Sequence, residues 1–186
     1  VCSSDLSISI SDGAYGIFGG SVYTNKITAS GSGKALFNSA VDISSGIISL
    51  TNGNITFNDI NISDCVLQYN GTGTVIFNGK VVGTAISIGS GEVDFSGDLS
   101  TALNILKSGG TIRFADGVVL SSSVDNTTGY NGAGTIKASG NLTITGSIGA
   151  TNSLKDLYVP KAWEQQGFEG LDGVAWVRKT IVLSDE

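Results

Sequence analysis

The sequence contains no histidine and no methionine, and it has only two cysteines and one proline in 186 residues. Without histidine there is no Ser-His-Asp triad, no Cys-His dyad and no histidine-ligated zinc site. Two cysteines are too few for a four-cysteine metal site or a disulfide scaffold. The net charge of −6 argues against a nucleic-acid partner, and no apolar run approaches the ~18 residues of a membrane helix. We therefore expect no metal, no cofactor and no nucleic acid.

Charge is also scarce, whereas small polar residues are abundant. Charged residues make up 14% of the chain, against the usual ~25%. Glycine, serine, threonine and asparagine together account for 81 residues. Such a composition can indicate disorder. Because 40% of the residues are hydrophobic and the mean hydropathy is +0.22, it instead predicts an all-β protein with many tight turns.

The two ends of the chain differ from the middle. Val1 to Leu6 read VCSSDL, which resembles a translated sequencing adapter, so we interpret residues 1–6 as an artefact and Cys2 as non-native. Cys65 is then the only native thiol, and we expect it to be a small core residue rather than a nucleophile. Residues 155–186 hold both tryptophans and the only proline. This atypical tail is either a cap over the core or an out-of-frame, chimeric segment.

Residues 7–154 carry an internal repeat centred on phenylalanine. Six phenylalanines recur at intervals of 18 to 20 residues, and Ala138 takes the place of a seventh. They are Phe18, Phe37, Phe57, Phe77, Phe95 and Phe114. From the second repeat on, the residue two places before the phenylalanine is apolar, whereas its two neighbours are polar or mixed. This period of two predicts a short strand with the phenylalanine facing inward.

Two further apolar columns complete each repeat. One lies four residues after the phenylalanine and is broken only by Asn61; the other includes the pair Ile105 and Leu106. Each repeat thus predicts three short strands, which cannot bury their apolar face alone but can do so by stacking on the next repeat. The sequence therefore predicts an all-β, parallel (right-handed) β-helix solenoid of about seven coils. The competing antiparallel sandwich explains hairpin signals such as Asn52-Gly53, but not a register of 18 to 20 residues.

Two sets of polar residues fall in matching positions of successive repeats. Asn38, Asn58 and Asn78 each follow a phenylalanine, and we interpret them as a structural ladder at a coil corner. A charged cluster comprises Glu92, Asp94, Arg113 and Lys137. Its last three members share one outward column, where acid beside base is typical of a solvated ladder. The alternative is a catalytic cluster of paired carboxylates, as in a polysaccharide lyase or hydrolase.

The repeat units resemble those of a known class of surface protein. The segments are GTGTVIFNGKVVG, GGTIRFADGVVLSSS and GAGTIKASGNLTITGSIGATNSLKDLYV. They are similar to passenger repeats of Gram-negative autotransporters, including rickettsial-type surface antigens, over about residues 15–158. The FN segments that begin at Phe37, Phe57 and Phe77 also resemble chlamydial polymorphic outer-membrane proteins. The resemblance implies a passenger β-helix at the bacterial cell surface and a downstream outer-membrane barrel in the full-length protein, and it supplies no catalytic residues.

These observations predict a non-enzymatic function. We expect a fragment of a surface stalk with a structural or adhesive role, located outside the cell and binding a host-surface protein or glycan. One alternative is a β-helical polysaccharide lyase or hydrolase, which a concave charged cluster on one face would favour. A second is a piece of a phage tail fibre, which obligate trimer formation would favour.

Overall fold

The computed structural model describes the backbone of residues 6–43, 46–50, 52–69, 71–105, 109–126 and 132–158, and side chains in these ranges except 46–50 and 62–66. Within them every strand pair is parallel, and the chain forms a β-solenoid of about seven turns. The predicted fold class is thereby confirmed, and the antiparallel sandwich is wrong. Cys2, Pro160, Trp163 and Trp176 lie outside the described residues, and so does the side chain of Cys65.

Seventeen strands are described, and they all belong to one sheet that winds around the axis. In chain order they are β1 (Ser7–Ile10), β2 (Tyr15–Phe18), β3 (Val22–Thr24), β4 (Lys26–Ala29), β5 (Lys34–Ile43), β6 (Gly46–Leu50), β7 (Asn54–Tyr69), β8 (Thr74–Phe77), β9 (Val81–Ile88), β10 (Glu92–Phe95), β11 (Leu99–Ile105), β12 (Thr111–Phe114), β13 (Val118–Leu120), β14 (Val124–Asn126), β15 (Ala133–Ala138), β16 (Leu142–Ile144) and β17 (Leu154–Tyr158).

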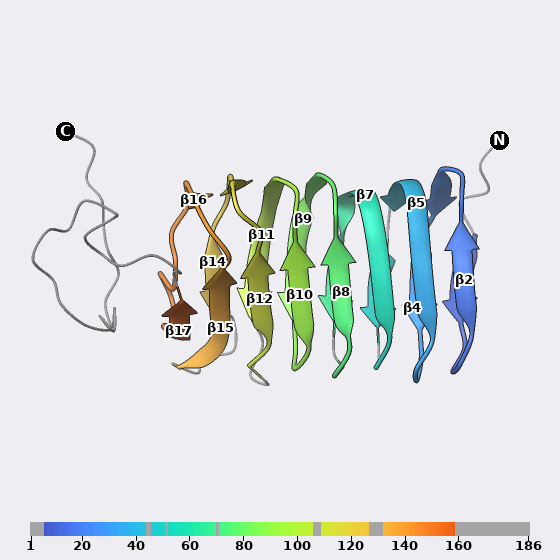
Figure 1. Ribbon diagram of the computed structural model, residues 1–186, viewed down its shortest axis with the longest axis horizontal. Coiled ribbons are helices and arrows are strands. Elements are labelled where there is room, and N and C mark those ends of the chain that lie inside the picture. Colours follow the sequence, from blue (N-terminus) through green and yellow to red (C-terminus); the bar gives the residue numbers. More distant parts are fainter. Residues whose placement is uncertain are drawn as a thin grey trace, which may run out of the picture.

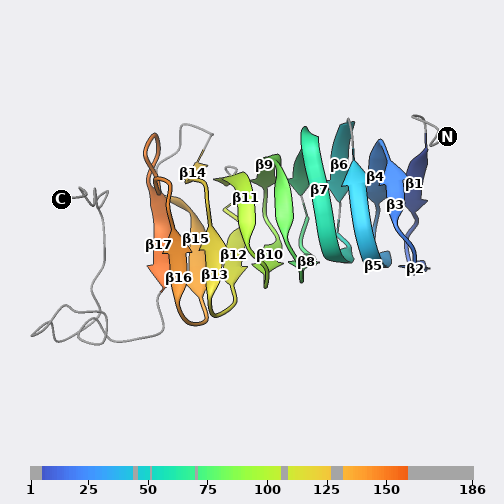
Figure 2. The same cartoon turned by 90° about the horizontal axis from the view of Figure 1, so that it is seen from above.

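The coils follow one another along the long axis, with the N-terminal coil at one end and β17 at the other (Figures 1 and 2). Three separate strands per coil occur in the β2-β3-β4 and β12-β13-β14 turns. In β5, β7, β9 and β11 neighbouring segments fuse around a corner, and β7 runs through a whole turn as 16 residues. Strand β17 pairs with β15, so the first residues of the tail predicted from position 155 belong to the last described strand.

The six phenylalanine rings form one stack in the core. Strands β2, β5, β7, β8, β10 and β12 pair in register, which sets each ring directly above its counterpart. Neighbouring ring centroids are 4.5 to 5.6 Å apart, and the ring planes differ by 7 to 21°. Five of the rings are at most 1% exposed, whereas Phe18, at the end of the stack, is only partly buried. The stack ends at Phe114, because the residue paired with it on the next coil is Ala138, which has no ring.

The second apolar column differs from the sequence prediction. The break expected at Asn61 does not exist, because Ile60 takes that place, pairs with Val41 and Val81, and is 3% exposed. The physical reason is a corner that is one residue shorter in this coil, visible as a register shift between Phe37 and Ala40. A fixed count of four residues from the phenylalanine therefore lands on the residue after the buried one.

The third column shows the same effect at the corner within β11. The apolar pair of β11 is Leu103 and Ile105, which face Ile86 and Ile88 of β9, and Leu106 lies outside the described residues. A register shift between Ser100 and Ala102 accounts for this displacement. Corners of unequal length thus absorb insertions and deletions while the core keeps its columns.

Acidic and amide side chains tie successive coils together at the corners. In each case a side-chain oxygen accepts a hydrogen bond from a backbone N–H one coil further along, at 2.6 to 3.2 Å. The acceptors are Asp12, Asn52, Asn54, Asp59, Asp98, Asp116 and Asp125. The hydroxyl and N–H of Ser32, which both donate to the Asp12 carboxylate, lower the pKa of that group. These polar residues therefore have a structural role.

Candidate functional site

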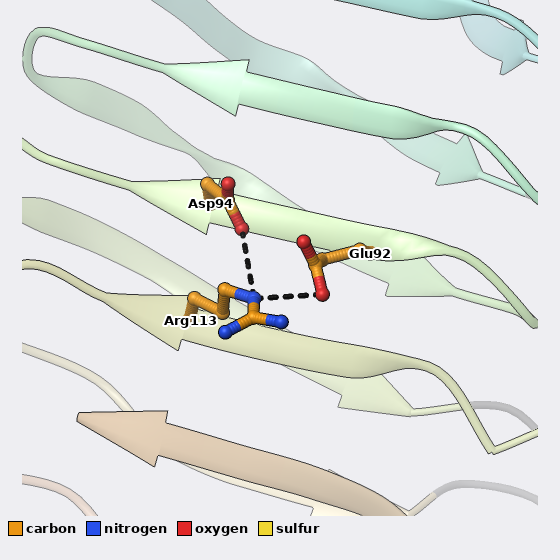
Figure 3. A network of polar contacts seen from close by, with 3 residues as sticks. All are labelled: Glu92, Asp94 and Arg113. Carbon is orange, nitrogen blue, oxygen red and sulfur yellow. Dashed lines mark ion pairs between the residues drawn. The ribbon is translucent and has the colours of Figure 1, made fainter. Parts of the chain in front are cut away.

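The charged cluster predicted from the sequence lies on the outer face of β10 and β12. Glu92 and Asp94 are two residues apart on one strand and so share a face, and Arg113 pairs with Asp94 across the sheet. The Arg113 Nε atom is 2.7 Å from Glu92 Oε2 and 3.9 Å from Asp94 Oδ1 (Figure 3). The guanidinium therefore bridges both carboxylates.

Lys137 is the fourth member of the predicted cluster, but it does not join this network. It pairs with Arg113 in register on β15, and among the described residues its ammonium group forms no ion pair. Instead, its Nζ atom lies 5.9 Å from the centroid of the Tyr158 ring on β17. A cation over an aromatic face is weakly attractive. The structure thus brings three of the four predicted residues together and turns the fourth toward the next strand.

The electrostatics of the cluster centre on Asp94. Burial raises the pKa of this carboxyl group, the neighbouring Glu92 raises it further, and Arg113 opposes both effects. Its Oδ1 atom is buried and accepts no hydrogen bond. A raised carboxyl pKa can serve general acid catalysis. Here, however, the guanidinium already engages the neighbouring carboxylate, and the three side chains also satisfy the simpler description of a cross-strand ion-pair ladder.

Replacing Asp94 with asparagine is expected to leave the fold intact and to raise its stability slightly at pH 7, by less than about 1 kcal/mol because the site is partly exposed. The pKa of Asp94 is higher in the folded state, so its contribution to stability is present below the unfolded pKa and is lost as the pH rises through the folded one. The gain in the variant should accordingly shrink as the pH is lowered. Urea denaturation at several pH values measures it.

The matched control for this variant is Glu92→Gln, which removes the carboxylate in closest contact with Arg113. It should lower stability at neutral pH, opposite in sign to Asp94→Asn. Equal losses in both variants would contradict the assignment of Asp94 as the destabilised member of the ladder.

The asparagine ladder predicted at a coil corner is present as a chain of hydrogen bonds. The Asn58 side-chain amide donates to the Asn38 backbone carbonyl at 3.0 Å, and Asn78 donates to the Asn58 side-chain oxygen at 3.2 Å. Asn58 thus both donates and accepts, whereas the side chain of Asn38 takes no part in the ladder. The arrangement links three coils on the exposed surface, which is a structural role.

Asn58→Ala should therefore destabilise the protein by about 1–2 kcal/mol, the value of two partly exposed hydrogen bonds. Asn38→Ala is the matched control, since it removes the same group from the same corner without breaking either side-chain bond. Its effect should be within about 0.5 kcal/mol. Thermal and urea denaturation measure both, and equal losses would show that the ladder does not act through these bonds.

A groove that the sequence pattern did not predict lies on the strand segments that follow the phenylalanine in successive coils. It has a volume of about 360 Å³ and is lined by residues of β3, β5, β7 and β9 and of the corners before them: Tyr23, Ala40, Val41, Asp42, Asp59, Ile60, Asn61, Lys80 and Val82. These residues align across the strands only when the short corner of the third coil is taken into account. One outward row is then formed by Tyr23, Asp42, Asn61 and Val82. Counting a fixed number of residues from each phenylalanine does not reveal this row.

Other kinds of site receive no support from the described part of the chain. No group of three or more Cys, Asp or Glu residues there could hold a metal ion. Among the same residues, no helix is long and apolar enough to span a membrane.

Comparison with known proteins gives one informative relative. The chain is 31% identical over 138 residues to "Outer membrane protein A" of Rickettsia rickettsii. The matched segment covers 73% of this chain but 6% of that protein. No family profile matches the sequence. No solved structure matches it either. The partial match supports a relationship to outer-membrane surface antigens, and the activity of the whole relative does not carry over to so short a segment.

Proposed function

We propose that this chain is part of a surface-displayed passenger rod of autotransporter type, with a structural and adhesive role and no chemistry of its own. The observation that supports this most is the unbroken in-register stack from Phe18 to Phe114. Such a stack makes each coil a template for the next, so a rod can extend by repetition and its stability is roughly additive over coils. The partial similarity to a rickettsial outer-membrane protein agrees with this role.

The outer surface suits display outside the cell. Its charged groups are few, and much of the polar surface consists of Thr, Ser and Asn, which offer hydrogen bonds without strong charge. Polar corner groups are bonded to the next coil, as at Asp116 and Asn141, which leaves the flat faces between corners for contact with a partner. We propose a host-surface protein or a glycan as that partner.

An adhesion assay tests this proposal. Beads coated with the purified 186-residue chain should bind cultured animal cells saturably, and binding should be competed by the soluble chain; albumin-coated beads are the control. Small-angle X-ray scattering should give the profile of a rod. Absence of binding to every cell type tried would overturn the adhesive role.

Two alternative functions predict different results for the same purified protein. A polysaccharide-cleaving enzyme would use the paired carboxylates of Glu92 and Asp94, so the chain is also incubated with a panel of polysaccharides. Release of new chain ends that is lost in Asp94→Asn would support the enzyme and contradict a passive rod. An obligate trimer in light scattering would support a tail-fibre piece instead.

A further inference from the structure

The groove has a volume of about 360 Å³, which is large enough for a small ligand. Its volume lies within the ~300–1,000 Å³ typical of sites for small ligands. It opens on the outer face of β3, β5, β7 and β9, which follow one another along the rod, with β3 nearest the N-terminal end (Figure 2). Tyr23, Asp42, Asn61 and Val82 stand side by side across these strands.

The hollow has a structural cause in the short corner of the third coil. There, Ala40 pairs with Asp59 and Val41 with Ile60, after the register shift that follows Phe37. The small side chain of Ala40 leaves space at the surface, and the side chains of Val41 and Ile60 point into the core, so strand backbone forms the floor. The groove is thus fixed by the paired strands and by the length of this corner, and Lys80 joins it from the corner before β9.

Two charged groups of the groove are uncommitted. Among the described residues, the Asp42 carboxylate and the Lys80 ammonium group have no hydrogen bond or ion pair. The Asn61 Oδ1 atom is buried without a partner. Asp59 uses Oδ1 to accept the backbone N–H of Lys80 at 3.1 Å.

An aromatic ring stands beside these groups. Tyr23 is 54% exposed, although exposing a tyrosine ring to water on a flat strand brings no stability. An aromatic face next to a carboxylate acceptor and an ammonium donor matches a sugar ring. The C–H face of a sugar packs on the aromatic ring, and its hydroxyl groups both donate and accept hydrogen bonds.

The charge of the groove narrows the class of sugar. The lining contains two carboxylates, those of Asp42 and Asp59, and one ammonium group, that of Lys80, so it carries a net negative charge. This charge opposes an acidic sugar such as a sialic acid or a uronic acid. We propose that the groove binds a neutral sugar unit of a glycan, with Tyr23 as the stacking surface and Asp42 as an acceptor. The inference rests on the adhesive role proposed above and gives that role a ligand class and a place on the rod.

Glycan binding by the full chain tests the inference. The labelled protein is applied to immobilised glycans that end in neutral hexoses, in N-acetylhexosamines, in sialic acid or in uronic acid. Binding to neutral sugars is expected, and Tyr23→Ala and Asp42→Asn should each weaken it about tenfold or more. Tyr15→Ala is the matched control, because Tyr15 is also an exposed tyrosine of the first coils but lies on β2, outside the groove. Circular dichroism verifies that the variants are folded.

Several results would overturn the inference or the adhesive function, and they can be told apart. No binding to any neutral glycan, binding confined to acidic sugars, or equal affinity in Tyr23→Ala and Tyr15→Ala would exclude a neutral-sugar site in this groove. Cell adhesion that persists unchanged in Tyr23→Ala would overturn the groove while leaving the proposed adhesive function intact. Sugar binding without cell adhesion would overturn the adhesive function alone.

Discussion

Phe77→Ala is expected to lower the free energy of unfolding by about 3–5 kcal/mol, the usual cost of deleting a buried phenyl ring from a core. Phe77 is 1% exposed and lies between two other rings, with its centroid 5.4 Å from that of Phe57 and 5.0 Å from that of Phe95. Its removal leaves a cavity that the paired strands on either side hold open, because their spacing is set by backbone hydrogen bonds. Urea denaturation followed by circular dichroism measures the loss.

The matched control is Phe18→Ala at the end of the same stack. Phe18 is only partly buried and stacks on one ring, Phe37, at 4.5 Å. Its loss should cost less than half as much as that of Phe77. In a solenoid each coil contacts only its neighbours, so Phe77→Ala should also broaden the unfolding transition by uncoupling the two halves of the rod. Equal, small effects of both substitutions would contradict a core carried by the ring stack.

The ring stack was predictable because parallel in-register strands place equivalent residues one above the other. A residue type that recurs at the coil length must then meet itself, which is what Phe37, Phe57 and Phe77 do. The asparagine ladder follows for the same reason, since each asparagine directly follows a phenylalanine. Both features lie within a strand or next to its end, where no corner intervenes between the reference residue and the position predicted.

Positions beyond a corner could not be predicted in the same way. The corner after Phe57 is one residue shorter than the one after Phe37. The buried position is therefore Ile60 instead of Asn61, and Asn61 lies in the lining of the groove. Hydrophobic periodicity does not report corner length, because both arrangements keep the alternation within each strand. The corner hydrogen bonds of Asp12 and Asp116 were hidden for a related reason: Asp-Gly signals a turn but does not indicate which backbone N–H lies one coil away.

Gly73→Ala should destabilise the protein by about 2–4 kcal/mol, through overpacking and a weakened hydrogen bond. A Cβ atom at Gly73 would collide with the backbone carbonyl oxygen of Gly53 in the coil before it. Gly53 has the same relationship to Gly33, since a Cβ atom added at Gly53 would lie 2.6 Å from the Gly33 oxygen. Glycines thus lie directly on one another at this corner because only they allow such a close approach of backbone to backbone.

The collision cannot be relieved cheaply, since the obstacle is backbone and not the end of a flexible side chain. The Gly73 carbonyl oxygen accepts the Glu92 N–H at 3.1 Å, so moving this peptide to make room would strain the bond to the next coil. Gly19→Ala is the matched control: no atom lies within 4 Å of its added methyl group, and the change should be neutral or slightly stabilising. Thermal denaturation of the two variants measures the difference in their stability. If Gly73→Ala were as stable as Gly19→Ala, the corner would have to be more open than the stacked glycines indicate, and the coil spacing at this edge would not be set by backbone contact.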